Sequence, residues 1–401
     1  MKTKEKVSID EFDGKRFQIR LVEPKDNKKA ILTHYLHNIH NGVSKHYKKD
    51  ALKVLKEYIE YKEQDENISM VADQALQQLL FEVENVPFPT PDNYTFKFID
   101  LFAGIGGFRL AMQNLGGKCV FTSEWDKDAQ KTYRANFGEI PFGDITKQHV
   151  KNYIPDNFDV LCAGFPCQAF SIAGKRGGFD DTRGTLFFDV AEIIKKHKPK
   201  AIFLENVKGL RSHDKGKTLE TILNVLRNDL GYHVFTKIIN SKDFGVPQSR
   251  ERIFIVGFNK NDFNSEINFE FPESKNENVF IANYLESNVE GYSITEHLQK
   301  SYIYKKEDGK PHIVDKNSQT YVKTLVSTYH KIQRLTSTFV KDGQTGLRLF
   351  TKNECIAIMG FPPEFIVPVS RTQMYRQFGN SVAVPAIQAT ARKILDLIKN
   401  K

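Results

Sequence analysis

The chain has 401 residues, enough for two or three domains with a sizeable hydrophobic core. Hydrophobic residues make up 40% and charged residues 27% of it, and no run of about 18 apolar residues occurs, which excludes a disordered chain and a membrane-spanning one. The net charge of +9 favours a polyanionic partner, although a merely basic soluble protein is equally compatible with it. The four cysteines have no CxxC spacing and no nearby histidine pair, so we expect neither a metal site nor a disulfide framework.

The first 93 residues are rich in charge and predict a helical N-terminal extension, because apolar residues recur at helical spacing from Lys29 to Tyr61. The stretch 86–91 holds three prolines, which cannot continue a helix, and we interpret it as a linker. The charged start of the chain is unlike a signal peptide, so we place the protein in the cytoplasm. Two roles for the extension stay open: an accessory DNA-binding module and a solvated helical cap.

Beyond the linker, short apolar strands alternate with helical stretches, which predicts an α/β fold with a doubly wound, mostly parallel sheet. Ligands of such sheets bind beyond the carboxyl ends of the strands. We expect a catalytic and cofactor-binding domain at 94–258, a smaller irregular domain at 259–346, and a C-terminal segment at 347–401 that returns to the catalytic domain. The expected strands are 96–102, 119–123, 160–163, 201–204, 234–239 and 253–258.

The segment 98–107 is a strand that runs into a glycine turn, which lets a ligand approach the backbone, although a purely structural turn would look similar. The full GxGxxG pattern is missing because Arg109 holds its last position, which favours a nucleoside-type cofactor without phosphates. Glu124 follows the loop at the offset where an acid meets ribose hydroxyls. Trp125 could stack on an adenine or be a core aromatic, and Asp144 could accept an amino-group hydrogen bond.

The strand 160–164 ends in a glycine and delivers Pro166 and Cys167 to a loop at the active edge of the sheet. A thiolate is a strong nucleophile, and a nearby cation such as Arg250 could lower the pKa of the thiol. We expect the other three cysteines to be small buried hydrophobes. The glycine-rich, basic stretch that follows Cys167 is typical of a lid over a phosphate backbone.

The strand 201–207 ends in a carboxylate and an amide, and burial of such groups is costly unless they find partners. Glu205 is therefore a candidate general acid. Gln248, Arg250 and Arg252 alternate along an extended segment, so they could face a bound anion together or form a solvated charge run.

These strings, in this order, resemble the DNA cytosine-5 methyltransferase family from about Phe96 to the end of the chain. The resemblance implies S-adenosylmethionine as the cofactor and Cys167, Glu205, Arg250 and Arg252 around the target base. It also implies that Asn206 helps to hold the proline-cysteine loop. The residues that it places around the cofactor are Phe102, Gly104, Ile105, Glu124, Trp125, Asp144, Ile145, Leu186, Asn380 and Ser381.

In this family a cysteine thiolate adds to C6 of cytosine while a carboxylic acid supports or protonates N3, so that C5 can attack the sulfonium methyl group. The cytosine must first be flipped out of the base stack. The segments 291–300 and 324–336 resemble the recognition domain of bacterial enzymes that modify CCGG at the outer cytosine. The residues expected to contact DNA are Gln168, Ser171, Lys175, Arg176, Gln248, Ser327, His330, Gln333 and Arg334.

The resemblance implies double-stranded DNA as the partner and a cognate restriction endonuclease that shares the site, and we expect a monomer. Two alternatives stay open. A few relatives methylate transfer RNA through the same cysteine and glutamate, although the long recognition segment argues against RNA. A DNA-binding regulator in which the N-terminal helices repress a promoter is a different class, and the intact catalytic set argues against it.

Overall fold

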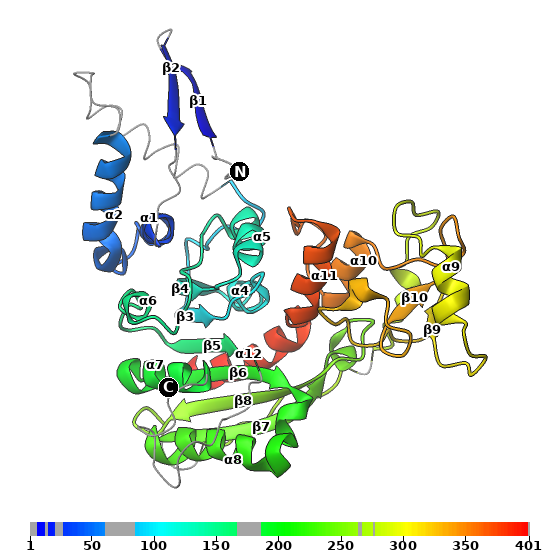
Figure 1. Cartoon of the computed structure of the whole chain (residues 1–401). Helices are drawn as coiled ribbons and strands as arrows, with labels where there is room; N and C mark the ends of the chain where they lie inside the picture. Colours follow the sequence, from blue (N-terminus) through cyan, green and yellow to red (C-terminus); the bar gives the residue numbers. More distant parts are fainter. Residues whose placement is uncertain are drawn as a thin grey trace.

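A six-stranded sheet forms the centre of the computed structural model, which describes residues 6–12, 15–20, 27–60, 85–166, 186–263, 267–275 and 277–399 (Figure 1). The strand order is β4-β3-β5-β6-β8-β7. The first four of these strands are parallel, and β8 runs antiparallel to both β6 and β7. The mostly parallel sheet is thus confirmed. Its strands are β3 (Phe96–Leu101), β4 (Gly117–Ser123), β5 (Val160–Gly164), β6 (Ala201–Val207), β7 (Tyr232–Asn240) and β8 (Glu251–Asn259).

Helices cover both faces of the sheet because alternate strand residues point to opposite sides. In β5, Cys162 joins one hydrophobic cluster, whereas Leu161 and Ala163 join the other. The cluster around Cys162 includes α4 (Gly107–Gln113), α5 (Lys127–Phe137) and α12 (Val384–Lys399). The opposite cluster includes α1 (Lys28–His37), α2 (Ser44–Glu60), α6 (Gln148–Lys151), α7 (Leu186–His197) and α8 (Lys217–Asn224).

A well-defined N-terminal cap fixes the start of α5 close to the end of β4. The Asp126 side chain accepts hydrogen bonds from the backbone N–H groups of Asp128 and Ala129, which is a strong N-terminal cap. The helix ends at Gly138, which has a positive φ of 70°. Because β4 ends at Ser123, only a short connection separates strand and helix, and Glu124 and Trp125 lie in it.

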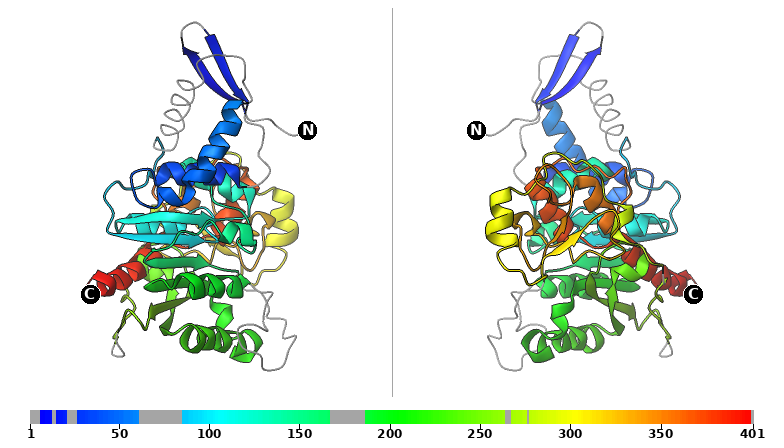
Figure 2. Two further views of the ribbon diagram at one scale, coloured as in Figure 1. Left: turned by 90° about the vertical axis from the view of Figure 1, so that its left-hand side faces the viewer. Right: turned by 90° about the vertical axis from the view of Figure 1, so that its right-hand side faces the viewer.

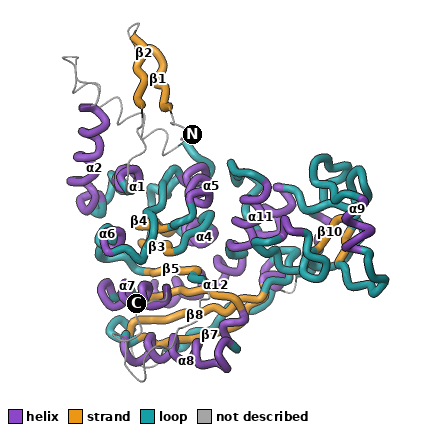
Figure 3. The backbone as a smooth tube through the Cα atoms, in the orientation of Figure 1, coloured by secondary structure: helices purple, strands orange, loops and turns teal. Residues whose placement is uncertain are grey.

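The segment 267–346 consists mostly of loops (Figure 3). Its regular elements include α9 (Glu296–Leu298) and a parallel pair of short strands, β9 (His312–Val314) and β10 (Thr338–Val340). Arg348 is fully buried behind this segment and forms ion pairs of 2.8 Å with Asp342 and with Glu354. The chain then continues into α10 (Lys352–Met359) and α11 (Arg371–Asn380), which lie beside the segment 267–346 (Figure 1).

The N-terminal region differs from the expected helical extension in two ways. Two strands, β1 (Lys6–Phe12) and β2 (Lys15–Arg20), form an antiparallel pair, because apolar residues alternate in them with a period of two. The helices α1 and α2 also do not form a solvated cap. Their residues Ile31, Leu36 and Tyr47 share one core cluster with Phe121 and Phe142 of the catalytic domain, and α1 lies beside the cyan strands in both side views (Figure 2).

Candidate active site

The glycine loop after β3 is held in a conformation that few side chains adopt. Phe102 has a positive φ of 55°, which is uncommon for a bulky residue, and Gly104 has the same φ. A Cβ atom on Gly107 would lie 2.7 Å from a Val382 methyl carbon and 3.2 Å from the Ser381 hydroxyl oxygen. The absence of a side chain at Gly107 therefore lets the segment after α11 approach the loop closely.

Glu124 ties the end of β4 to this loop. The Gly104 N–H donates to Glu124 Oε2 at 2.8 Å, and the Asp126 N–H donates to Oε1 at 2.8 Å. Burial raises the pKa of this carboxyl group, and the two backbone hydrogen bonds oppose the shift. Each carboxylate oxygen can accept a second hydrogen bond, so the group retains acceptor capacity for hydroxyls.

Trp125 is 73% exposed, so the alternative of a core aromatic is wrong. Asp144 is partly exposed, and its Oδ1 accepts from the Thr146 N–H at 3.0 Å. Partial burial opposes ionisation of Asp144, but its bonds with Thr146 and the nearby Lys147 hold the pKa of the carboxyl group below its ordinary value. The adjacent Ile145 is buried in the core.

These groups suit the nucleoside part of S-adenosylmethionine: an open indole face, a carboxylate just after β4, and a second carboxylate two residues beyond Phe142, which bridges to Ser123 at the end of β4. The charge of Arg109 is neutralised inside the core by Glu139 at 2.8 Å, so it is not available for a phosphate. Ser381 lies against the loop at Gly107, and Asn380 is exposed beside it. Ile105 is buried, and Leu186 begins α7 without a described contact to the loop.

A second group of polar residues lies at the carboxyl end of β6, next to the end of β5. The Glu205 side chain is buried, and a Cβ atom on Gly164 would lie 3.6 Å from its Oε2. The Asn206 amide donates to the Phe165 carbonyl at 2.8 Å, so the expected tether to the chain before Pro166 is present. Cys167 follows directly in sequence but lies outside the described residues, as do Gln168, Ser171, Lys175 and Arg176.

Among the described residues, Glu205 has one ion-pair partner. Its Oε1 forms an ion pair of 3.0 Å with Arg252 Nε. Burial raises the pKa of the Glu205 carboxyl group, and Arg252 followed by Arg250 opposes the shift without cancelling it. A raised pKa favours the protonated form of a carboxyl group, which is the form that a general acid needs.

Arg250 does not face an anion together with Arg252. Its Nη1 donates to the Leu325 carbonyl at 2.9 Å, and its Nη2 donates to the carbonyls of Gly379, at 3.0 Å, and Ser381. Burial, with Arg252 as the second cause, lowers the pKa of Arg250 to about 9. The hypothesis of a common anion site is therefore wrong for Arg250 in this conformation, because its terminal nitrogens bind carbonyl groups.

Comparison with known families adds the deciding observation. The family described as C-5 cytosine-specific DNA methylase matches residues 96–396. The chain belongs to this family. It is a DNA (cytosine-5)-methyltransferase that uses S-adenosylmethionine.

Relatives of high identity support the assignment. The chain is 51% identical to Type II methyltransferase M.HpaII of Haemophilus parainfluenzae over 355 residues, which is 83% of this chain and 97% of the relative. It is 57% identical to Type II methyltransferase M.MspI of Moraxella sp over 300 residues, 75% of this chain and 70% of the relative. A solved S. pombe Dnmt2 methyltransferase has a TM-score of 0.62 at 20% identity, covering 76% of this chain and all of that chain, and shows the fold alone.

Two residues of this methylase that were expected to contact DNA are structural instead. Gln248 is fully buried: its amide donates to the Ile358 carbonyl at 3.1 Å and its Oε1 accepts the Leu325 N–H at 2.7 Å. Arg334 donates to the carbonyls of Ile303 and Lys306 and pairs with Asp308. Both predictions are wrong in this conformation because the polar groups are already committed within the protein.

The remaining recognition candidates are partly exposed. They are Ser327, His330 and Gln333, of which Gln333 accepts a hydrogen bond from the Thr336 hydroxyl at 2.7 Å. Gly379 was not among the residues expected from the sequence, although its neighbours Asn380 and Ser381 were. A Cβ atom on Gly379 would lie 2.1 Å from the Ser327 backbone nitrogen. This glycine therefore lets the backbone at Val326 and Ser327 pack directly on α11.

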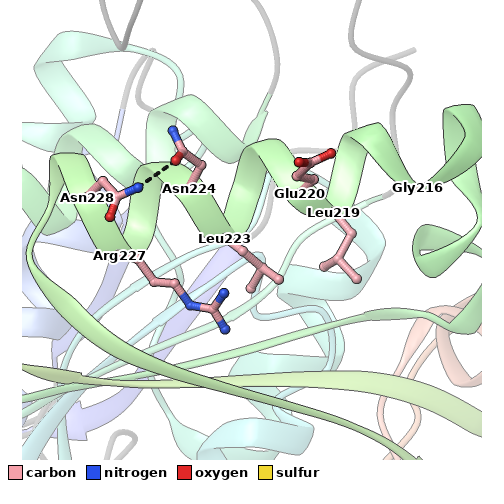
Figure 4. Close-up of a pocket in the computed structure, with 7 residues that line it drawn as sticks. All are labelled: Gly216, Leu219, Glu220, Leu223, Asn224, Arg227 and Asn228. Atoms are coloured by element: carbon pink, nitrogen blue, oxygen red, sulfur yellow. Dashed lines mark hydrogen bonds between the residues drawn. The ribbon is translucent and has the colours of Figure 1, made fainter.

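A separate hollow lies along α8, lined by Leu219, Leu223 and Arg227 among others (Figure 4). The Arg227 guanidinium donates to the Val234 carbonyl at 3.0 Å, and Asn228 donates to Asn224 at 2.6 Å. No expected site residue of the methylase lines it. Within the described part of the chain, no helix is long and apolar enough to cross a membrane.

Proposed function

We propose that the enzyme methylates the outer cytosine of CCGG in duplex DNA, with Cys167 as the nucleophile and Glu205 as the acid. The observation that carries the assignment of the chemistry is the position of Glu205 and Asn206. Glu205 is a buried carboxyl group beside Gly164, and Asn206 holds the Phe165 carbonyl just before the Pro166-Cys167 pair. The choice of CCGG rests on the resemblance of residues 291–300 and 324–336 to recognition domains of that specificity.

In the proposed reaction the target cytosine is flipped out of the duplex, and the Cys167 thiolate adds to its C6. Glu205 donates a hydrogen bond or a proton to N3, which places the electron pair at C5. S-adenosylmethionine supplies a methyl group on a sulfonium, and this group is transferred to C5. Water takes the C5 proton, the thiolate leaves C6, and any proton on N3 returns to Glu205, which restores the ring and the enzyme.

Each residue around Glu205 has a distinct part in this proposal. Arg252 orients the carboxyl group through its 3.0 Å ion pair. Arg250 joins the region around Glu205 to the proposed recognition segment, residues 267–346, and to the C-terminal end of α11 through its three carbonyl partners. On the cofactor side, Glu124 and Asp144 bind hydroxyl and amino groups, and Trp125 stacks on the adenine ring.

We further propose that the protein acts as a cytoplasmic monomer whose product is resistant to a cognate CCGG-cutting endonuclease. The test is to express the chain in cells that lack cytosine methylation and to map the modified bases of a plasmid by bisulfite sequencing. Conversion-resistant cytosine at the outer position of CCGG is the expected result. Methylation at other sites would refute the specificity, and methylation at the inner cytosine would refute only the choice of base.

The Cys167→Ser variant tests the chemistry separately. It should transfer no methyl group, and in the presence of S-adenosylmethionine duplex DNA with 5-fluorocytosine at the target should trap the wild type covalently but not the variant. The fluorine cannot leave as a proton does, so the bond from sulfur to C6 persists. Unchanged turnover by the variant would remove Cys167 from its proposed role.

A further inference from the structure

The outer edge of β4 is covered by the N-terminal helices rather than by another strand. An edge strand presents unpaired N–H and C=O groups, and burying them without partners is costly. The Tyr47 hydroxyl donates to the Val120 carbonyl at 2.7 Å, and the Thr122 N–H donates to His34 Nε2 at 3.1 Å. Further along the edge, Phe142 bonds to the Thr122 carbonyl and to the Glu124 N–H. The last residues of β4 are thus fully paired up to Glu124.

His34 is fully buried at this edge, and both of its ring nitrogens are engaged. Since Nε2 accepts the Thr122 N–H, Nδ1 carries the proton and donates to the Ala30 carbonyl at 2.9 Å. This is the arrangement of a neutral imidazole. The ring also lies 4.5 Å from the Phe142 ring, measured between centroids, so it packs against the segment that follows α5.

The same helix holds the chain that leads to Asp144. Asn27, just before α1, accepts the Gly143 N–H at 2.9 Å, and the Thr33 hydroxyl accepts the Ile140 N–H at 3.1 Å. Together with the His34 ring, these bonds hold the segment 138–145 against α1. Asp144 and Ile145 come directly after the last of them.

A third connection reaches α4, which begins at the glycine loop. His37 Nδ1 lies 2.8 Å from the Thr90 hydroxyl oxygen, and Arg109 of α4 donates to that oxygen at 3.0 Å. Arg109 also pairs with Glu139 at 2.8 Å, and His34 Nε2 lies 3.5 Å from the same Glu139 oxygen. The end of β4, the segment 138–145 and the start of α4 are therefore all held in place by α1 or by its immediate contacts.

We infer that the α1–α2 pair is a positioning element for the cofactor half of the active site, with His34 as its central positioning residue. The inference rests on the proposed cofactor roles of Glu124 and Asp144. It assigns to the N-terminal helices neither DNA binding nor mere coverage of the core. Loosening α1 should displace the end of β4 and the segment 138–145 and so weaken cofactor binding, while the acid side at Glu205 is unaffected.

The test compares four full-length proteins: the wild type, His34→Leu, His34→Gln and the control Ile222→Ala. Leucine removes the acceptor for the Thr122 N–H, whereas glutamine retains an acceptor oxygen. Ile222 is fully buried on α8, whose main element contacts are with the neighbouring helical turns at 208–216 and 225–229, so its truncation lowers stability without removing a hydrogen bond of α1. The measurements are the melting temperature, KM for S-adenosylmethionine, kcat, duplex affinity, and backbone hydrogen exchange at 117–125 and 138–146 without cofactor.

We expect His34→Leu to raise KM for S-adenosylmethionine by about tenfold, as loss of a buried amide's partner implies. Hydrogen exchange should become faster in both segments, with kcat and duplex affinity unchanged, and His34→Gln should restore most of KM. An unchanged KM in His34→Leu, or an equal rise in Ile222→Ala, would overturn the inference. If Glu124→Ala raises KM in the active enzyme but His34→Leu does not, the proposed cofactor site stands and only this inference falls.

Discussion

The replacement Glu205→Gln separates the proton-donating role of this residue from its space-filling role. Glutamine has nearly the same volume and keeps an oxygen 3.0 Å from Arg252 Nε, but it cannot transfer a proton. A positioned general acid contributes roughly 10²- to 10⁴-fold to a rate, so kcat should fall by about that factor. The fold should survive, because the Arg252 side chain is 16% exposed and retains both water and an amide partner.

The assay is single-turnover transfer of a labelled methyl group to a CCGG duplex, with cofactor and duplex affinities measured in parallel. Glu251→Gln is the matched control, since Glu251 starts the neighbouring strand β8 and pairs with the exposed Lys208 at 2.8 Å. The control should retain wild-type kcat. If Glu205→Gln kept most of the wild-type kcat while its fold and affinities were intact, the assignment of Glu205 as the acid would be wrong.

The pH dependence of the wild type follows from the same group. Burial raises the pKa of Glu205, and the reactive form is the protonated one. The rate of the chemical step should therefore be highest below this raised pKa and should decline as pH rises through it. In Glu205→Gln that decline should vanish, whereas a persistent decline would point to another titrating group.

Three further changes test the surrounding structure. Asn206→Ala removes the 2.8 Å bond to the Phe165 carbonyl, so kcat should fall about tenfold with unchanged cofactor affinity; a change in cofactor affinity alone would contradict this. Gly379→Ala would place a methyl group 2.1 Å from the Ser327 nitrogen and should destabilise the protein by about 1–3 kcal/mol and weaken duplex binding, whereas Gly209→Ala, with 4.0 Å of clearance, should not. Burial raises the pKa of Asp100 to about 8, whereas the unfolded chain releases this proton near pH 4. The folded state therefore holds one more proton between these pH values, and stability should fall by up to about 1.4 kcal/mol per pH unit as pH rises from about 4 to about 8. Asp100→Asn should remove this slope in denaturant titrations, and an unchanged slope would refute the assignment.

The sheet and the ends of its strands could be predicted from the sequence because they depend on local patterns. All six expected strands are present. Glu205 and Asn206 lie at the end of β6, as the carboxylate and amide after an apolar run predict. The exposed position of Trp125 needed the structure, because an aromatic residue after a strand is compatible with both burial and exposure.

The partners of Gln248, Arg250 and Arg334 could not be predicted. Period-two alternation correctly indicates an extended segment, but it cannot say what faces each side chain. The Gln248 amide meets Ile358, 110 residues further along the chain, and an Arg250 nitrogen meets Gly379, 129 residues away. The docking of α1 was hidden for the same reason: His34 meets Thr122 across 88 residues, and no local pattern encodes that contact.

The position of Arg250 links the proposed recognition segment to the glycine loop. One guanidinium holds Leu325 of the proposed recognition segment together with Gly379 and Ser381 at the end of α11, and Ser381 lies against the glycine loop at Gly107. The pKa of about 9 leaves Arg250 protonated at neutral pH, so these bonds to carbonyl groups are charge-assisted. A displacement of the recognition segment must therefore either move the segment beside the cofactor loop or break a buried, charged hydrogen bond. Since the second course is costly, the structure favours movement of the two regions together.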